Sequence, residues 1–232
     1  MSGASAARPI GVAAGRELVL VVPREVAPGP LSWHGLRLGG VDALLEALPG
    51  HGEFRPRSEV ESQDQWQQVI PHLVVRSGDR ILTMRRLRKG SERRLHGQVT
   101  LGVGGHVNAT DGPLDEAFAN GCRREWTEEV ICARPLVGKM VGLIKDDAGE
   151  VGRVHLGVLI LVEADGVAVG VREREKLEGR MLSVEELGVL YLEMETWSQF
   201  VFDQLLRGPS DVLGTGGPQL VLPPSAAEFD GC

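Results

Sequence analysis

Cysteine, long apolar runs and positive charge are scarce in this 232-residue chain, and each scarcity excludes a class of protein. The three cysteines, Cys122, Cys132 and Cys232, form no CxxC pair and are odd in number. This argues against a disulfide framework or a cysteine-based zinc site and favours a reducing, cytoplasmic compartment. The longest apolar runs, 18–22 and 156–162, are far shorter than the ~20 residues that span a bilayer, so we expect no membrane insertion.

The charge balance argues against a stable nucleic-acid partner. The chain has 25 Lys and Arg residues against 32 Asp and Glu residues, a formal net charge of −7, whereas broad binding to nucleic acid needs a basic surface. The first 16 residues lack the basic segment and following apolar stretch of a secretory signal. With 42% apolar and 25% charged residues, the composition is that of an ordinary globular protein.

The sequence divides into three segments. Residues 1–65 form an N-terminal extension with a strand pattern at 17–23 and a short helical pattern at 41–48. Residues 66–207 carry the densest strand and helix patterns, and the Gly, Pro, Ser and Ala content of 208–232 predicts a flexible tail. The extension buries too little to fold alone. We favour a strand that extends the sheet of the main domain, and a homodimer contact is the alternative.

The patterns within residues 66–207 predict an α+β fold, with a mixed sheet and helices on both faces. Two strand patterns surround a three-residue glycine turn and predict a hairpin. The run 154–162 is nearly all apolar, as is typical of a central strand covered on both faces. The expected strands are 69–76, 80–86, 99–107, 141–144, 154–162 and 167–172, and the expected helices are 114–130 and 195–206.

The helix expected at 114–130 gathers acidic residues beside its apolar face. Glu125, Glu128 and Glu129 stand at i, i+3 and i+4, within an arc of roughly 100°. Like charges at this spacing destabilise a helix by about 0.2–0.5 kcal/mol per pair. A hard divalent cation such as Mg²⁺, which prefers oxygen ligands, would remove the repulsion. Because glutamate pairs on a helix more often form a solvated face, the interpretation depends on the residues around them.

Those surrounding residues complete a longer pattern. Arg124 directly precedes Glu125, Glu116 stands eight residues before Arg124, and the pair Gly104 and Gly105 precedes the helix. The segment satisfies E-x7-R-E-U-x-E-E in full, where U is a bulky apolar residue, here Trp126. On these positions it resembles the Nudix box, G-x5-E-x7-R-E-U-x-E-E-x-G-U. The order of elements over residues 66–207 is similar to a Nudix domain, and the stretch 95–107 resembles a branch described as predicted phosphoesterases.

The resemblance implies a Nudix-type α/β/α sandwich and a metal-dependent hydrolase. Nudix hydrolases use Mg²⁺ or Mn²⁺ and direct water at a phosphorus atom of a nucleoside-diphosphate-X substrate, which splits the pyrophosphate link. The cations neutralise charge on bridging oxygens and lower the pKa of bound water. The implied partner is a small nucleotide-type diphosphate. The sequence does not favour either metal, because carboxylate and water ligands suit both.

The resemblance also assigns a role to each box residue. Arg124 is expected to orient a carboxylate through charge-assisted hydrogen bonds. Glu116 either pairs with Arg124 or reaches the metal through a water molecule, and both residues are candidate catalytic residues, as is Glu128. The implied metal ligands are Glu125, Glu128, Glu129 and the backbone carbonyl of Gly105.

Several residues outside the box receive predictions. The resemblance implies a general base that is either a box glutamate or a carboxylate from a later loop. The later-loop candidates are Glu173, Glu175 and Glu178, and Glu175 is preferred because it shortly precedes a strand pattern. Arg85 and Arg86 end a strand in a basic stretch and are candidates for binding substrate polyphosphate, since a local positive field attracts anions. His155 is interpreted as a buried histidine and Trp197 as a core residue.

The segment departs from the family pattern at two points. Ten residues, rather than five, separate Gly105 from Glu116, which indicates a five-residue insertion within 108–113, and Ile131 replaces the later glycine.

Two other functions compete with hydrolysis. A Nudix-fold module that binds nucleotide without cleaving it is the alternative, but such modules typically lose box glutamates, and this chain keeps them. An isoprenoid diphosphate isomerase needs a cysteine that faces a glutamate, a position that neither Cys122 nor Cys132 fits.

Overall fold

The computed structural model describes residues 17–30, 32–86, 97–172, 177–207 and 217–225. The strands are β1 (Leu18–Pro23), β2 (His34–Leu38), β3 (Glu53–Pro56), β4 (Trp66–Ser77), β5 (Arg80–Arg86), β6 (Val99–Thr100), β7 (Val130–Cys132), β8 (Leu136–Asp146), β9 (His155–Glu163), β10 (Val169–Val171), β11 (Leu177–Ser183) and β12 (Gln219–Leu222). The α-helices are α1 (Val41–His51), α2 (Arg57–Val60), α3 (Leu114–Glu129), α4 (Glu150–Arg153), α5 (Val184–Val189) and α6 (Thr196–Val201). A π-helical turn, η4 (Phe202–Leu206), continues α6, so that the two together cover the predicted last helix.

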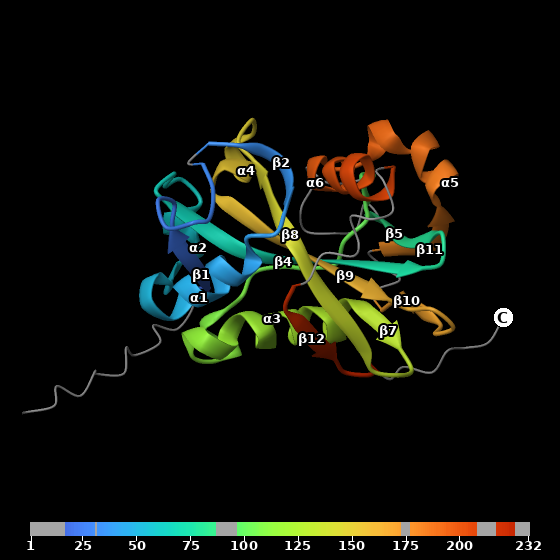
Figure 1. The fold of residues 1–232 in the computed structure, drawn as a ribbon, viewed down its shortest axis with the longest axis horizontal. Helices are drawn as coiled ribbons and strands as arrows, with labels where there is room; N and C mark the ends of the chain where they lie inside the picture. Colours follow the sequence, from blue (N-terminus) through green and yellow to red (C-terminus); the bar gives the residue numbers. More distant parts are fainter. Residues whose placement is uncertain (1–16, 31, 87–96, 173–176, 208–216, 226–232) are drawn as a thin grey trace, which may run out of the picture.

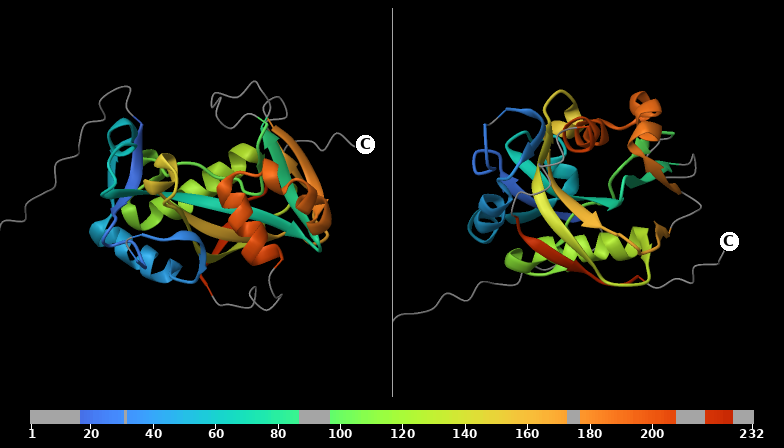
Figure 2. Two further views of the ribbon diagram at one scale, coloured as in Figure 1. Left: turned by 90° about the horizontal axis from the view of Figure 1, so that it is seen from above. Right: turned by 45° about the vertical axis from the view of Figure 1, so that its right-hand side comes forward.

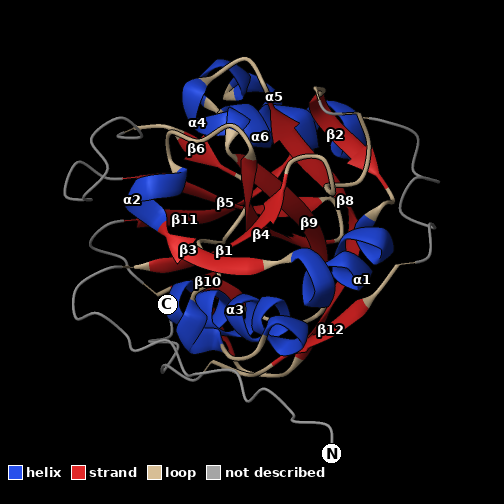
Figure 3. Ribbon diagram, turned by 90° about the vertical axis from the view of Figure 1, so that its left-hand side faces the viewer, coloured by secondary structure: helices blue, strands red, loops and turns tan. Residues whose placement is uncertain are grey.

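One mixed sheet with helices on both faces organises the chain, as predicted. Its main order is β11-β5-β4-β9-β8-β12, and the central pair β4 and β9 is parallel. Figure 1 shows α3 on one side of the sheet and α5 and α6 on the other, and Figure 3 shows the strands at the centre with helices around them. Nearly every residue of β9 is buried, which confirms the prediction of a central strand.

Two apolar layers hold the helices against the sheet. Leu73 and Val75 of β4 belong to the layer that includes Phe118 and Trp126 of α3. Val74 of β4 belongs to the opposite layer, with residues of α5 and α6. Alternate residues of a strand face opposite sides, so each central strand supplies both layers. Among the described residues, no helix is long and apolar enough to cross a membrane.

A glycine-rich segment occupies a gap beside β4. The strand β5 pairs with β4 only at the hairpin end, and β1 pairs with β4 only around Gln68. Between them, Leu73 and Val103 exchange two backbone hydrogen bonds of 2.7 and 2.9 Å. The strand predicted at 99–107 is therefore wrong beyond β6. A Cβ atom on Gly104 would collide with the carbonyl oxygen of Pro71, so the backbone approaches β4 too closely for a regular strand with side chains.

The N-terminal extension supports this same segment. The strand β1 pairs with β3 and with β4, and Leu20 donates a backbone hydrogen bond of 2.7 Å to the carbonyl of Val107. Arg24 forms an ion pair of 2.6 Å with Asp147, which follows β8. In both views of Figure 2 the N-terminal elements, blue to cyan, gather at the end of the sheet away from α5 and β11. The extension thus contacts the chain just before α3.

Part of the predicted flexible tail belongs to the fold. Within 208–232, residues 219–222 form β12, which pairs antiparallel with β8. Leu220 and Leu222 are buried in the same layer as α3, and the indole Nε1 of Trp126 donates 2.9 Å to the carbonyl of Pro223. The prediction of a tail is therefore wrong for 217–225. The alternation of buried and exposed residues in β12 is only four residues long and lies among glycines and prolines, which concealed it.

Candidate active site

The helix α3 places its carboxylates at the rim of a buried face. Phe118, Cys122 and Trp126 pack into the core, and the helix ends where β7 begins. Glu125 is buried, with 8% of its surface exposed, whereas the side chain of Glu128 is 57% exposed. Glu129 is half-buried. Within one helix turn, the three carboxylates therefore range from buried (Glu125) through half-buried (Glu129) to exposed (Glu128).

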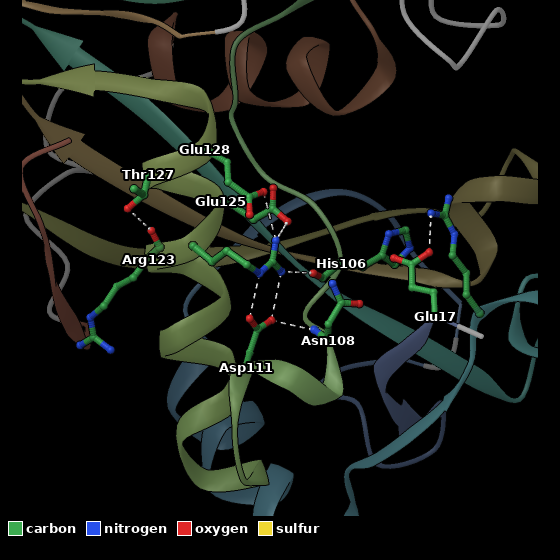
Figure 4. A network of polar contacts seen from close by, with 10 residues as sticks. Glu17, His106, Asn108, Asp111, Arg123, Glu125, Thr127 and Glu128 are labelled. Carbon is green, nitrogen blue, oxygen red and sulfur yellow. Dashed lines mark hydrogen bonds and ion pairs between the residues drawn. The ribbon is translucent and has the colours of Figure 1, made fainter. Parts of the chain in front are cut away.

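The guanidinium of Arg124 joins the groups around it into one network (Figure 4). Its Nε and Nη2 donate to the two carboxylate oxygens of Asp111 at 2.8 and 3.0 Å. Its Nη1 donates to Glu125 at 2.7 Å and lies 3.4 Å from Glu128, and Nη2 also donates to the carbonyl of His106 at 2.7 Å. Arg124 therefore hydrogen-bonds two carboxylates, and its role in orienting one for catalysis stays a prediction.

Asp111, rather than Glu116, pairs with Arg124. Glu116 is exposed in the first turn of α3, and none of the hydrogen bonds that Arg124 makes among the described residues reaches it. The prediction that the two pair is wrong, and the alternative of a water-mediated path from Glu116 to a metal stays a prediction. The sequence held a signal for Asp111, since five residues separate it from Gly105, as in the family pattern.

Burial and hydrogen bonding shift the pKa values of Asp111, Glu125 and Arg124. Burial works to raise the pKa of Asp111, but hydrogen bonds from Arg124 and the backbone of Asn108 outweigh it and leave that pKa below its ordinary value. Burial raises the pKa of Glu125 despite its hydrogen bond with Arg124. The hydrogen bond to Asp111 raises the pKa of Arg124 further above its ordinary value. Asp111 and Arg124 therefore form a fixed ion pair, and hydrogen bonding compensates the burial of Glu125 less completely than that of Asp111.

The backbone before α3 lies directly against the box carboxylates. A Cβ atom on Gly105 would stand 2.6 Å from Oε1 of Glu125, so any side chain at this position would displace that carboxylate. The next residue, His106, shares a 2.9 Å hydrogen bond between its Nε2 and Oε1 of Gln68. Burial, with the nearby charge of Arg57, lowers the pKa of His106 to about 3, so its ring is neutral near pH 7. These contacts hold Gly105 in reach of the carboxylates, and its role as a metal ligand stays a prediction.

The donor set fits a hard divalent cation. Glu125 and Glu128 both approach Nη1 of Arg124, so two carboxylates already converge on one positive charge. Carboxylate and carbonyl oxygens are the ligands that Mg²⁺ and Mn²⁺ prefer. The described part of the chain contains no group of three or more His, Cys, Asp or Glu side chains already arranged around a metal position. Ligation by Glu125, Glu128 and Glu129 therefore stays a prediction.

The remaining predicted residues lie apart from this network or outside the description. Arg85 donates to Glu193 at 2.6 Å and to the carbonyl of Gly97 at 2.8 Å, not to the box. Its proposed contact with substrate would require leaving Glu193. Glu178 is exposed and pairs with Arg180. The predictions for Glu173, Glu175 and the Arg86 side chain fall outside the described residues.

His155 and Trp197 are both half-buried. The Nδ1 atom of His155 lies 2.6 Å from the carbonyl oxygen of Val151, a contact that helps to satisfy the ring, but the ring is not buried as predicted. Trp197 packs against the layer under α6, in agreement with its interpretation as a core residue. Cys122 and Cys132 are buried and form no disulfide within the described residues, in agreement with their interpretation as small apolar residues.

The chain is similar to known proteins in both sequence and structure. No protein-family model matches the chain. Protein YmaB from Bacillus subtilis is 35% identical over 203 residues, which cover 82% of this chain and 97% of YmaB. The crystal structure of Tm1382, a proposed Nudix hydrolase, is 34% identical and superposes with a TM-score of 0.70, covering 82% of this chain and 98% of Tm1382.

Proposed function

Because the chain belongs to the Nudix hydrolase superfamily, we propose that it cleaves a pyrophosphate bond in a nucleoside-diphosphate-X substrate in a reaction that depends on Mg²⁺ or Mn²⁺. One observation carries the proposal. Arg124 fixes Glu125 and approaches Glu128 on a single helix, against a glycine that leaves the carboxylates open to a ligand. A module that only binds nucleotide has no need for two box carboxylates held against one arginine in this way.

The protein residues divide the work of the reaction. Glu125, Glu128, Glu129 and the carbonyl of Gly105 would hold the cation, and Arg124 would position Glu125 without touching the substrate. A bound cation would neutralise charge on the phosphate oxygens and lower the pKa of the attacking water. Glu128 is the candidate general base among the box residues, because it is the most exposed of the three glutamates expected to hold the cation and could accept a proton from water.

Phosphate release tests the proposal directly. The panel would contain nucleoside triphosphates, ADP-ribose, dinucleoside polyphosphates and NAD-type dinucleotides, each with Mg²⁺ or Mn²⁺ and a coupling phosphatase. We expect turnover with at least one substrate, its loss with a chelator, and its loss in the Glu129→Gln variant. Asp115→Asn is the matched control, because Asp115 is an exposed acid in the first turn of the same helix.

Two outcomes would contradict the proposal. Turnover that persists in a chelator, or that Glu129→Gln leaves unchanged, would move the chemistry away from the box helix. No turnover on any substrate, with nucleotide still raising the melting temperature, would favour the non-hydrolytic binding module. Ligand that binds the folded state raises stability by RT ln(1 + [L]/Kd), about 2.7 kcal/mol at one hundred times Kd, so such binding is measurable.

A further inference from the structure

The sheet face opposite α3 changes character along its length. Under α5 and α6 it carries the buried apolar residues Val74, Leu159 and Leu161. Towards the other end, the parallel register sets Gln68 beside His155 and Ile70 beside Gly157. Paired residues of parallel strands point to the same side, so these residues and His72 share this face. The aliphatic cover gives way there to polar and small residues.

The rings of Trp197 and His72 each pack directly against the backbone of a glycine in this region. Trp197 of α6 lies over Gly157, where a Cβ atom would come within 2.8 Å of its Cζ3 atom. The ring of His72 lies against Gly102 so closely that any side chain at that position would collide with it. The centroids of the two rings are 5.7 Å apart with an interplanar angle of 82°. The glycines thus allow a pair of rings to sit low on the sheet.

Two buried polar side chains in this region have unused hydrogen-bonding atoms. His72 is 5% exposed and Gln68 is 0% exposed, and within the described residues neither His72 Nε2 nor Gln68 Nε2 has a hydrogen-bond partner. The other amide atom of Gln68 contacts His106, so one polar atom is left over whichever way the amide is turned. Buried polar groups are nearly always satisfied, so such exceptions need a ligand or a water molecule.

The region adjoins the box network through one short loop. His106 contacts Gln68 with its ring and Arg124 with its carbonyl oxygen. Gly102 lies on His72 and Gly105 lies on Glu125, three residues further along the chain. Ile70, Trp197 and the glycines of the loop are half-buried, so solvent reaches this side. A ligand that spans the loop would place one end at the carboxylates and the other at the rings.

We propose that the ring patch, defined as Gln68, Ile70, His72, Gly157 and Trp197, binds the nucleobase of the substrate, which stacks on Trp197 and accepts or donates hydrogen bonds at His72 and Gln68. The inference rests on the function proposed above and deepens it. The patch has no charged member, which disfavours phosphate, and its unused polar atoms disfavour an alkyl chain. Burial lowers the pKa of His72, with Glu195 opposing the shift, so the ring is neutral near pH 7 and suits a neutral base.

Binding of monophosphates tests the patch without requiring hydrolysis. AMP, GMP, CMP and UMP carry a base, whereas ribose 5-phosphate has the same phosphate without one, and none contains a pyrophosphate bond. By calorimetry we expect at least one nucleotide to bind about ten-fold more tightly than ribose 5-phosphate. Trp197→Ala should weaken the binding of that nucleotide about ten-fold, because stacking on an aromatic ring supplies much of the affinity for a base. The same variant should bind ribose 5-phosphate with unchanged affinity.

Ring-preserving variants and a control make the test independent of folding. Trp197→Phe should keep most of the nucleotide affinity but abolish nucleotide quenching of tryptophan fluorescence. Trp33→Phe is the matched control and should keep the quenching, since Trp33 packs against the opposite layer near Arg37. His72→Phe keeps a ring against Gly102. It should weaken the binding of the nucleotide and leave the binding of ribose 5-phosphate unchanged.

Clear results would overturn the inference. If no nucleotide binds more tightly than ribose 5-phosphate, the patch does not bind a base. If Trp197→Ala, folded by circular dichroism, binds nucleotide like the wild type, Trp197 is not the stacking residue. Metal-dependent turnover lost in Glu129→Gln would still support the proposed hydrolase in either case, so the two failures are distinguishable.

Discussion

Two polar groups lie on opposite sides of the loop 102–106 and differ in how completely they are paired. Around Arg124, both carboxylate oxygens of Asp111 and one of Glu125 accept charged hydrogen bonds. In the ring patch, His72 and Gln68 are neutral and buried, and each has a polar atom that no group in the described part of the chain hydrogen-bonds. The charged side is therefore fixed by the protein itself. The neutral side is unsaturated, as expected where a ligand completes the hydrogen bonding.

Removal of the N-terminal extension should disrupt the Arg124 network and the ring patch together. A chain that starts at Asp64 loses β1, whose Leu20 holds Val107 on one side and whose Val21 pairs with Gln68 on the other. We expect loss of cooperative unfolding, because Leu20 and Val22 also leave the main core layer. Circular dichroism melting would measure this. A soluble truncated chain with an unchanged melting midpoint would show that the extension is separate, and would favour a dimer contact.

Loss of Arg124 should have the largest effect of any single substitution. Arg124→Met leaves the carboxylates of Asp111 and Glu125 without their cation, and these side chains are only 5% and 10% exposed. Removal of one partner from a buried pair costs about 3–5 kcal/mol. Urea unfolding would measure the change. Arg123→Met is the control and should cost less than about 1 kcal/mol, since Arg123 donates near the surface to two neutral acceptors, the carbonyl oxygen of Val221 and Oδ1 of Asn120, and so leaves no buried carboxylate behind.

The two acids near the helix start should respond differently. Asp111→Asn should lower the free energy of unfolding by about 1–3 kcal/mol, because it weakens the charged hydrogen bonds to Arg124 and to the Asn108 backbone. Glu116→Gln should stay within about 0.5 kcal/mol, as is usual for an exposed residue. Urea unfolding of both variants under one buffer would compare them. A reversed order would return the arginine-pairing role to Glu116.

The smallest expected effect is on the pH dependence of stability, through His72 in the ring patch. Burial lowers the folded-state pKa of His72 below its ordinary value of 6.5, and nearby Glu195 only partly offsets this. The unfolded chain therefore binds more protons below pH 6.5, so stability falls as the pH falls through this range. His72→Phe should reduce this slope by up to about 1.4 kcal/mol per pH unit. Urea unfolding at pH 7.5 and pH 5.5 would measure it, and an unchanged slope would place the titration elsewhere.

The sequence predicted best what lies within one element. The spacing of Arg124, Glu125 and Glu128 is set by a single helix, so their convergence followed from the helix period. Asp111 contacts Arg124 from a different element, and the match to a fixed family spacing pointed to Glu116 instead. The half-exposed position of Trp197 depends on Gly157 in a distant strand. Such contacts depend on how strands pair, which local patterns do not contain.

The same long-range pairing governs when the site can form during folding. The parallel strands β4 and β9 join residues 87 positions apart, as in the contact of Arg76 with Glu163. The gap that receives Gly102 to Gly105 exists only after β1, from the start of the described chain, has also joined β4. Because non-local pairings of this kind close late and slowly, α3 can be helical well before its carboxylates meet Gly105. Recovered activity after refolding would then report completion of the whole sheet rather than formation of its helices.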